Sequence, residues 1–122
     1  MVRVEARTGA VRDVRHLVAQ WARENGADTD VERTLTLLTS EVVTNAVEHG
    51  PEHGMIVVDV AREDSGFRVA VTDQSVQPPV VRPRASNQLR GRGMQLVSML
   101  ARDWGVDPDH GQGTCVWFVV AG

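Results

Sequence analysis

The sequence contains no lysine and no tyrosine, and its 122 residues include a single cysteine, Cys115. All 13 basic residues are arginine, so any side chain that clamps a phosphate here must be an arginine. One cysteine excludes an intramolecular disulfide framework and is typical of a reducing compartment. The apolar run from Val116 to Ala121 is far shorter than the roughly 20 residues of a membrane helix. No apolar signal region opens the sequence, so we expect a cytoplasmic protein.

The composition is that of an ordinary globular domain, with 42% hydrophobic residues, 24% charged residues and a net charge of −3. A chain of this length is expected to form one domain, over residues 1–122. Its pI of about 5.7 argues against a nucleic-acid-binding domain, for which a pI above about 9 is typical. We therefore expect no direct contact with nucleic acid and none with a membrane.

Apolar periodicity and turn residues divide the chain into helices and strands. Thr29 and Glu32 form the pattern of a capping box at the start of the second helix. The predicted elements do not alternate as in a doubly wound fold, which favours a two-layer α/β (α+β) sandwich with a mixed, mostly antiparallel sheet and helices on one face. The predicted helices are Ala10–Asn25, Thr29–His49 and Met94–Ala101, and the predicted strands are Arg3–Ala6, Met55–Val60, Phe67–Thr72, Trp104–Val106 and Thr114–Val120.

A long loop, from Gln74 to Arg90, lies between the predicted strand Phe67–Thr72 and the last helix. It contains three prolines and shows no apolar periodicity. Loops longer than about 12–15 residues are uncommon in compact domains unless they serve a function. Asp73 stands where the preceding strand ends and the loop begins. An isolated aspartate there is usually a solvated turn residue, but the long loop beside it favours a position in a cleft.

The second helix carries two polar residues that fit neither of its faces. Glu41 and Asn45 lie four residues apart, and therefore on one stripe that borders the apolar face. A carboxylate at the edge of a core must be hydrogen-bonded, paired or used. An acid and an amide in this arrangement can hold a hydrated divalent cation and orient a nucleophile; the alternative is a partly exposed Glu41 and an Asn45 that secures a neighbouring turn. At 100° per residue, Glu32, Arg33, Thr36, Thr39 and Ser40 gather on one side, and Leu35, Leu38, Val42 and Ala46 on the other.

A glycine-rich segment, Arg90-Gly91-Arg92-Gly93-Met94, directly precedes the last helix. Glycines at a helix N-terminus let backbone N–H groups approach an anion, and arginines can close on phosphate oxygens. The alternative is a loop-to-helix joint that needs unusual φ values. The segment is not a Walker A loop, which ends in Gly-Lys-Ser/Thr, and no strand leads into a complete Rossmann glycine motif.

Together these segments resemble the four ATP-site motifs of the Bergerat-fold (GHKL) ATPase and kinase superfamily, which includes the ATP-binding domains of gyrase, Hsp90, histidine kinases and MutL. The resemblance is strongest to the small anti-sigma-factor serine kinases of the sporulation and general-stress type, and it extends from about residue 8 to residue 120. The segments that carry it are Ser40-Glu41-Val42-Val43-Thr44-Asn45-Ala46, Asp73-Gln74-Ser75, Gly91-Arg92-Gly93-Met94 and Gly113-Thr114-x-x-Trp117.

The resemblance implies a histidine-kinase-like ATPase domain that uses ATP and Mg²⁺. By position, Glu41 matches the general base or hydroxyl-orienting residue, and Asn45 matches the amide that coordinates Mg²⁺ on the phosphates. Asp73 matches the acceptor of the adenine amino group, supported by Thr114, and the loop from Gln74 to Arg90 matches the ATP lid. The remaining nucleotide-contacting positions are Ser75 in the adenine motif and Arg90, Gly91, Arg92, Gly93 and Met94 around the phosphates.

The adenine motif departs from the usual Asp-x-Gly-x-Gly, because Ser75 stands in the place of the first glycine and cannot approach a base as freely. Two hypotheses remain open. In the first, the chain is an anti-sigma factor and protein serine kinase that phosphorylates a small antagonist and regulates transcription by partner switching. In the second, it is a non-enzymatic partner-binding regulator with a weak or vestigial ATP site. The resemblance also implies a homodimer, for which the helix over Ala10–Asn25 is a candidate contact surface. The acidic pI argues against a nucleic-acid ATPase of the MutL or gyrase type.

Overall fold

In the computed structural model the described residues are 1–74, 92–108 and 113–122. They form three helices and five strands, which match the predicted elements with boundaries shifted by at most three residues. The helices are α1 (Ala10–Glu24), α2 (Thr29–His49) and α3 (Arg92–Leu100), and the strands are β1 (Val2–Glu5), β2 (Met55–Glu63), β3 (Gly66–Asp73), β4 (Asp103–Pro108) and β5 (Thr114–Ala121).

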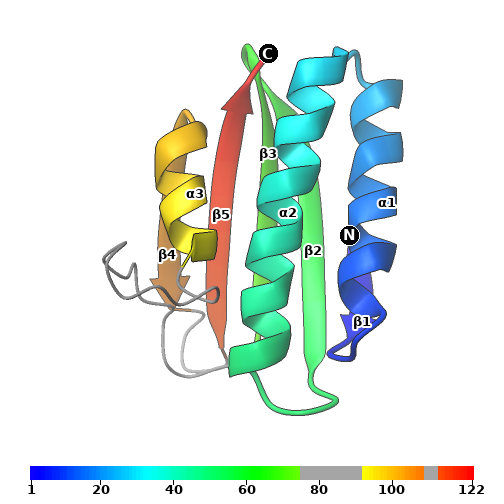
Figure 1. Cartoon of the computed structure of the whole chain (residues 1–122), viewed down its shortest axis with the longest axis vertical. Coiled ribbons are helices and arrows are strands. Elements are labelled where there is room, and N and C mark those ends of the chain that lie inside the picture. The colour runs from blue at the N-terminus through cyan, green and yellow to red at the C-terminus, as the bar shows by residue number, and fades with distance from the viewer. Residues whose placement is uncertain (75–91, 109–112) are drawn as a thin grey trace.

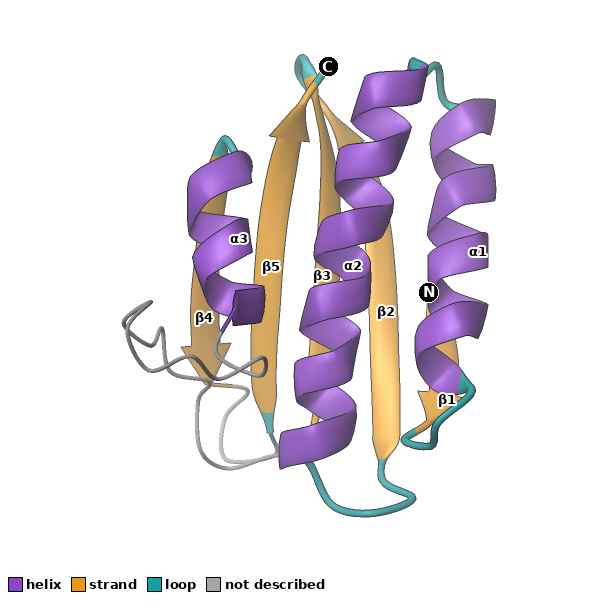
Figure 2. Ribbon diagram, viewed as in Figure 1, coloured by secondary structure: helices purple, strands orange, loops and turns teal. Residues whose placement is uncertain are grey.

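The strands form one sheet in the order β1-β2-β3-β5-β4, and all three helices cover the same face of it (Figure 1; Figure 2). This confirms the predicted two-layer sandwich. The sheet is not mixed, however, because each of the four pairings between described strands is antiparallel. Antiparallel strands need only a tight turn between them, as at residues 64–65, whereas a parallel pair needs a long crossover.

Strand β3 shows why these residues form a half-covered sheet. Phe67, Val69 and Val71 are buried toward the helices, while Arg68 and Ala70, which alternate with them, are partly exposed on the other face. Side chains of a strand alternate between faces, so a two-residue apolar period buries one face only. Trp21 of α1 packs edge-on against Phe67, with ring centroids 5.7 Å apart, and joins the helical layer to the sheet.

The cap of α2 differs from the capping box that the sequence predicts. Asp28, in an extended conformation, is the N-cap residue, and its side chain accepts a hydrogen bond from the Val31 N–H at 2.8 Å. Thr29 is already helical and so cannot serve as the cap. The Glu32 carboxylate instead pairs with Arg23 of α1, at 2.9 Å, and ties the two helices together.

The buried face of α2 is wider than predicted. Thr39, which the helical wheel placed with Thr36 and Ser40 on the polar side, is fully buried. The reason is that α2 is the central helix and contacts α1, α3 and the sheet, so that much of its circumference is covered. The Thr39 hydroxyl has no hydrogen-bond partner among the described residues.

The turn between β2 and β3 and the C-terminus lie at the end of the sheet that is uppermost in Figure 1. Two arginines donate hydrogen bonds to the backbone there. Arg62 donates to the carbonyl oxygens of Gly66 at 2.8 Å and Gly122 at 3.0 Å, and its guanidinium lies 3.9 Å from the centre of the Phe67 ring. Arg102 donates to the carbonyl oxygen of Ser65 at 3.1 Å. These contacts close the turn between β2 and β3 and fasten the last residues of β5 to it.

Candidate nucleotide-binding site

Four elements meet at the opposite, lower end of the molecule: the last turns of α2, the end of β3, the start of β5 and the start of α3 (Figure 1). Asp73 is the last residue of β3 and Thr114 the first of β5, and the two are directly paired across the sheet. Directly paired residues of antiparallel strands point to the same face, which here is the helix side. Asp73 is only 8% exposed and Thr114 only 2%, so a carboxylate and a hydroxyl lie buried together.

Helix α2 brings its two polar residues to this end, on the border of its apolar face. Asn45 is 7% exposed, and Glu41, one turn earlier, is half-buried. Burial of an amide or a carboxylate costs free energy that must be offset by hydrogen bonds or by a charged partner. An amide and a carboxylate stacked on one stripe of this helix are therefore a feature that folding alone does not favour.

Glycines allow the backbone to close tightly around Asp73. A Cβ atom on Gly113 would overlap the backbone carbonyl oxygen of Asp73. A Cβ atom on Gly50, the residue that ends α2, would lie 2.8 Å from the Ala46 carbonyl oxygen and 3.8 Å from the Asp73 Cβ atom. In the sequence, Gly113 belongs to the Gly113-Thr114 motif of the family resemblance, but no role of its own was predicted for it. Its position directly before a strand that begins with a buried threonine is the signal that could have indicated this role.

Helix α3 begins at this same end with Arg92 and Gly93, followed by the buried Met94. The free N–H groups and the dipole at the start of a helix favour an anion such as a phosphate. The structure therefore brings the described site residues together on α2, β3, β5 and α3. Ser75, Arg90 and Gly91 lie outside the described residues, and so does almost all of the predicted lid. At Arg92 and Gly93 only the helical backbone is described.

The oxygen-rich side chains at this end suit Mg²⁺, a hard cation that prefers oxygen ligands and usually binds through only one or two protein groups together with phosphates. In the described part of the chain, no group of three or more His, Cys, Asp or Glu side chains is placed to hold a metal by itself. Asn45 and Glu41 are the groups that would face such a cation. The buried Asp73 and Thr114 would instead face a ligand that offers a hydrogen-bond donor.

Asp73 thus lies at the end of β3 in close contact with a glycine, and an acid and an amide lie together on α2. A comparison with protein families agrees with this arrangement. The histidine kinase-like ATPase domain matches residues 4–120. The chain belongs to this family. Membership confirms the resemblance drawn from the four motifs and assigns the chain to a class of ATP-binding domains.

Solved structures of the family share the fold. The RsbU and RsbW domains of Rv1364c from Mycobacterium tuberculosis superpose with a TM-score of 0.68 at 21% identity over 98% of this chain and 32% of theirs. The histidine kinase domain of EL346 from Erythrobacter litoralis gives 0.56 at 23% identity, over 93% of this chain and 60% of that one. The catalytic domain of histidine kinase ThkA gives 0.58 at 16% identity, over 99% and 96%.

The chain thus spans about a third of the Rv1364c structure and nearly the whole of the ThkA domain. It shares its fold with one part of the longer chains. None of the helices in the described part of the chain is long and apolar enough to cross a membrane.

Proposed function

We propose that the chain is an anti-sigma factor and ATP-dependent protein serine kinase, which phosphorylates a small anti-sigma-factor antagonist and regulates transcription by partner switching. The observation that carries the proposal is the convergence of Glu41, Asn45, Asp73 and Thr114 at one end of a histidine kinase-like ATPase fold. The similarity to a structure that contains an RsbW domain supports the choice of this branch of the family.

The proposed roles follow from the placement of each group. Asp73, buried beside Thr114, accepts a hydrogen bond from the adenine amino group. Asn45 contributes its amide oxygen to the Mg²⁺ that accompanies the phosphates, and the N-terminus of α3 donates backbone N–H groups to them. Bound ATP supplies the phosphoryl group, and positioning with charge neutralisation provides most of the catalysis of its transfer.

Glu41 acts on the acceptor. It orients the serine hydroxyl of the antagonist and takes its proton as the bond from serine oxygen to the γ-phosphorus forms and the bond from that phosphorus to the β–γ bridging oxygen breaks. Its half-buried position one turn before Asn45 supports this role, because such a carboxylate would lie near the cation and stay within reach of a protein substrate. ADP leaves with the bridging oxygen.

The proposed partners are a sigma factor, the antagonist and a second copy of the chain, in the cytoplasm. An apolar hollow of about 330 Å³ between α1 and the strands β1 and β2 supports α1 as the contact surface of the homodimer. Leu17, which lines this hollow, is 44% exposed. Light scattering of the wild type and Leu17→Asp tests this part, with a dimer expected for the wild type and a monomer for the variant.

Calorimetry with Mg²⁺-ATP tests the nucleotide site directly. Asp73→Asn should weaken binding about 10- to 100-fold, because a hydrogen bond to a charged group contributes about 1.5–3 kcal/mol. Asp64→Asn, in the turn at the far end of the sheet, is the matched control and should bind as the wild type does. Equal affinities of the wild type and Asp73→Asn would contradict the assignment of the adenine site.

Phosphotransfer from γ-labelled ATP to a panel of small anti-sigma-factor antagonists tests the enzymatic part. The alternative function, a non-enzymatic regulator, is favoured by Ser75 in place of the motif's glycine. Under that alternative, the chain would bind a sigma factor or antagonist with the same affinity in the presence and absence of ATP, Asp73→Asn would change nothing, and no label would be transferred.

A further inference from the structure

The side chain of Gln74 completes the sheet at the point where the backbone of β3 no longer can. The pairing of β2 with β3 ends at Val57 and Thr72. Two residues further along this register, Met55 lies opposite Gln74, and its backbone N–H donates to the side-chain oxygen Oε1 of Gln74 at 2.9 Å. A side-chain amide thus takes the place that a backbone carbonyl would have in a regular ladder.

The end of β3 keeps its pairing with β5 after its pairing with β2 has stopped. Asp73 is paired with Thr114, whereas the last β3 residue paired with β2 is Thr72. A Cβ atom on Gly113 would overlap the Asp73 carbonyl oxygen and lie 3.1 Å from the Gln74 Cα atom, so the two backbones are in close contact. Asp73 therefore lies in a backbone segment that is paired with β5 on one side and linked to the start of β2 by the side chain of Gln74 on the other.

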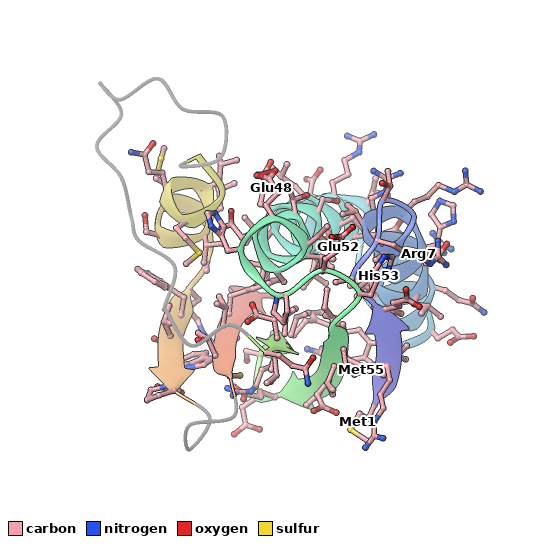
Figure 3. The ribbon with its side chains drawn as sticks, turned by 90° about the horizontal axis from the view of Figure 1, so that it is seen from below. Met1, Arg7, Glu48, Glu52, His53 and Met55 are labelled. Carbon is pink, nitrogen blue, oxygen red and sulfur yellow. The ribbon has the colours of Figure 1, made fainter. Side chains whose placement is uncertain are left out.

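The surface that receives this side chain is the turn that follows α2. A Cβ atom on Gly54 would lie 2.9 Å from Gln74 Oε1, so the absence of a side chain there gives the amide its space. The turn itself is closed by hydrogen bonds from the Gly54 N–H to the Pro51 carbonyl at 2.9 Å and from the Ala6 N–H to the Gly54 carbonyl at 2.8 Å. Figure 3 views the molecule from this end and shows the turn with His53, which leads from the end of α2 to the start of β2 at Met55.

We propose that Gln74 is a positioning residue for adenine binding: by bonding the Met55 N–H it holds the end of β3, and with it the Asp73 carboxylate, against the turn that ends α2. The inference rests on the proposed function, because it assigns Gln74 a role through Asp73. The hydrogen bond from the Met55 N–H requires an acceptor oxygen at the end of a side chain as long as that of glutamine. Glutamate retains that oxygen, and methionine has similar length but no comparable acceptor.

The test compares Gln74→Met with Gln74→Glu, and uses Asp64→Asn, in the turn at the far end of the sheet, as the control. Hydrogen exchange of the Met55 amide reports the bond itself, and calorimetry with Mg²⁺-ATP and Mg²⁺-ADP reports its consequence. Gln74→Met should exchange the Met55 amide faster and bind both nucleotides about three- to ten-fold more weakly, the range expected for one hydrogen bond. Gln74→Glu and Asp64→Asn should stay within about two-fold of the wild type, a margin well inside one hydrogen bond.

Adenine is common to ATP and ADP, so an equal loss for both nucleotides is the signature of a role through Asp73. In phosphotransfer, Gln74→Met should raise KM for ATP and leave kcat at saturating ATP unchanged. Faster Met55 exchange with unchanged nucleotide affinities would reduce Gln74 to a residue of the fold and overturn the proposal. So would unchanged Met55 exchange, or an equal loss in Gln74→Met and Gln74→Glu. A wild-type chain that binds no ATP would overturn the proposed function as well, and that result is distinguishable because it precedes any variant.

Discussion

The two ends of the sheet handle polar groups in opposite ways. At the upper end, the long side chains of Arg62 and Arg102 reach across the surface to backbone carbonyls, and their charges remain close to water. At the lower end, the short side chains of Asn45, Asp73 and Thr114 are each less than a tenth exposed. The first arrangement closes a chain end, whereas the second places polar groups where burial is costly.

The difference teaches how to separate structural from functional polar residues in this fold. An exposed cation on a carbonyl contributes modestly and could be replaced by other surface contacts. A buried carboxylate and amide carry a desolvation cost that apolar residues at the same positions would avoid. These two groups lie together at the lower end, where glycines let backbones close around Asp73. A ligand site accounts for this combination, whereas packing alone does not.

The largest expected effect concerns Glu41. Replacement by glutamine keeps the size and hydrogen-bonding capacity of the side chain but removes the proton acceptor, so phosphotransfer should fall about 100-fold or more, the range typical of a general base. The affinity for Mg²⁺-ATP should change little, as calorimetry on the same sample would show. Glu63→Gln, on the exposed far end of β2, should transfer at the wild-type rate. Full activity of Glu41→Gln would remove Glu41 from the reaction.

The next largest effect concerns Gly113. In Gly113→Ala the new methyl group overlaps the Asp73 carbonyl, which is backbone and cannot rotate away. The free energy of unfolding should fall by about 1–3 kcal/mol, as for other overpacked sites, and Mg²⁺-ATP should bind more weakly because the end of β3 moves. Gly9→Ala is the control, since its methyl group would meet only the movable guanidinium of Arg7. Denaturant unfolding that ranks the two variants equally would contradict this account.

The sequence predicts the elements of the fold well because their signals are local. Alternation in β3 and the helical period in α1 both survive in the structure. The placement of Thr39 on the polar side was wrong because it depends on the neighbours of α2, which a helical wheel cannot include. The capping box at Thr29 and Glu32 was wrong because Asp28 caps the helix and Glu32 pairs with α1. Of the candidate site, Glu41 and Asn45 were predicted from their spacing, Asp73 from the long loop that follows it and Thr114 from the family resemblance, and their roles stay predictions. The contact between Gln74 and Met55 was not predicted, since it lies beyond the last pair of the β2–β3 ladder, where no sequence pattern records the geometry.

A smaller effect is expected at the upper end, where the variant tests whether this end is structural only. Arg62→Met removes two hydrogen bonds to carbonyls and the contact with Phe67, and should lower the free energy of unfolding by about 1–2 kcal/mol. The affinity for Mg²⁺-ATP should remain that of the wild type, which calorimetry can check below the unfolding transition. A weakened nucleotide site in this variant would mean that the two ends of the sheet are coupled.

The smallest expected effect has the opposite sign and lies between the two ends, at Thr39. Its hydroxyl is fully buried without a partner among the described residues, and valine has nearly the same shape without the hydroxyl. Thr39→Val should therefore raise the free energy of unfolding by about 1 kcal/mol, because a buried unsatisfied polar group is costly. Thr36→Val is the matched control on the same helix: its hydroxyl donates to the Glu32 carbonyl at 3.0 Å, so its removal should bring no gain. If Thr39→Val destabilised the protein as much as Thr36→Val, the hydroxyl of Thr39 would have a hydrogen-bond partner in the folded protein in solution, and that bond would offset the cost of its burial.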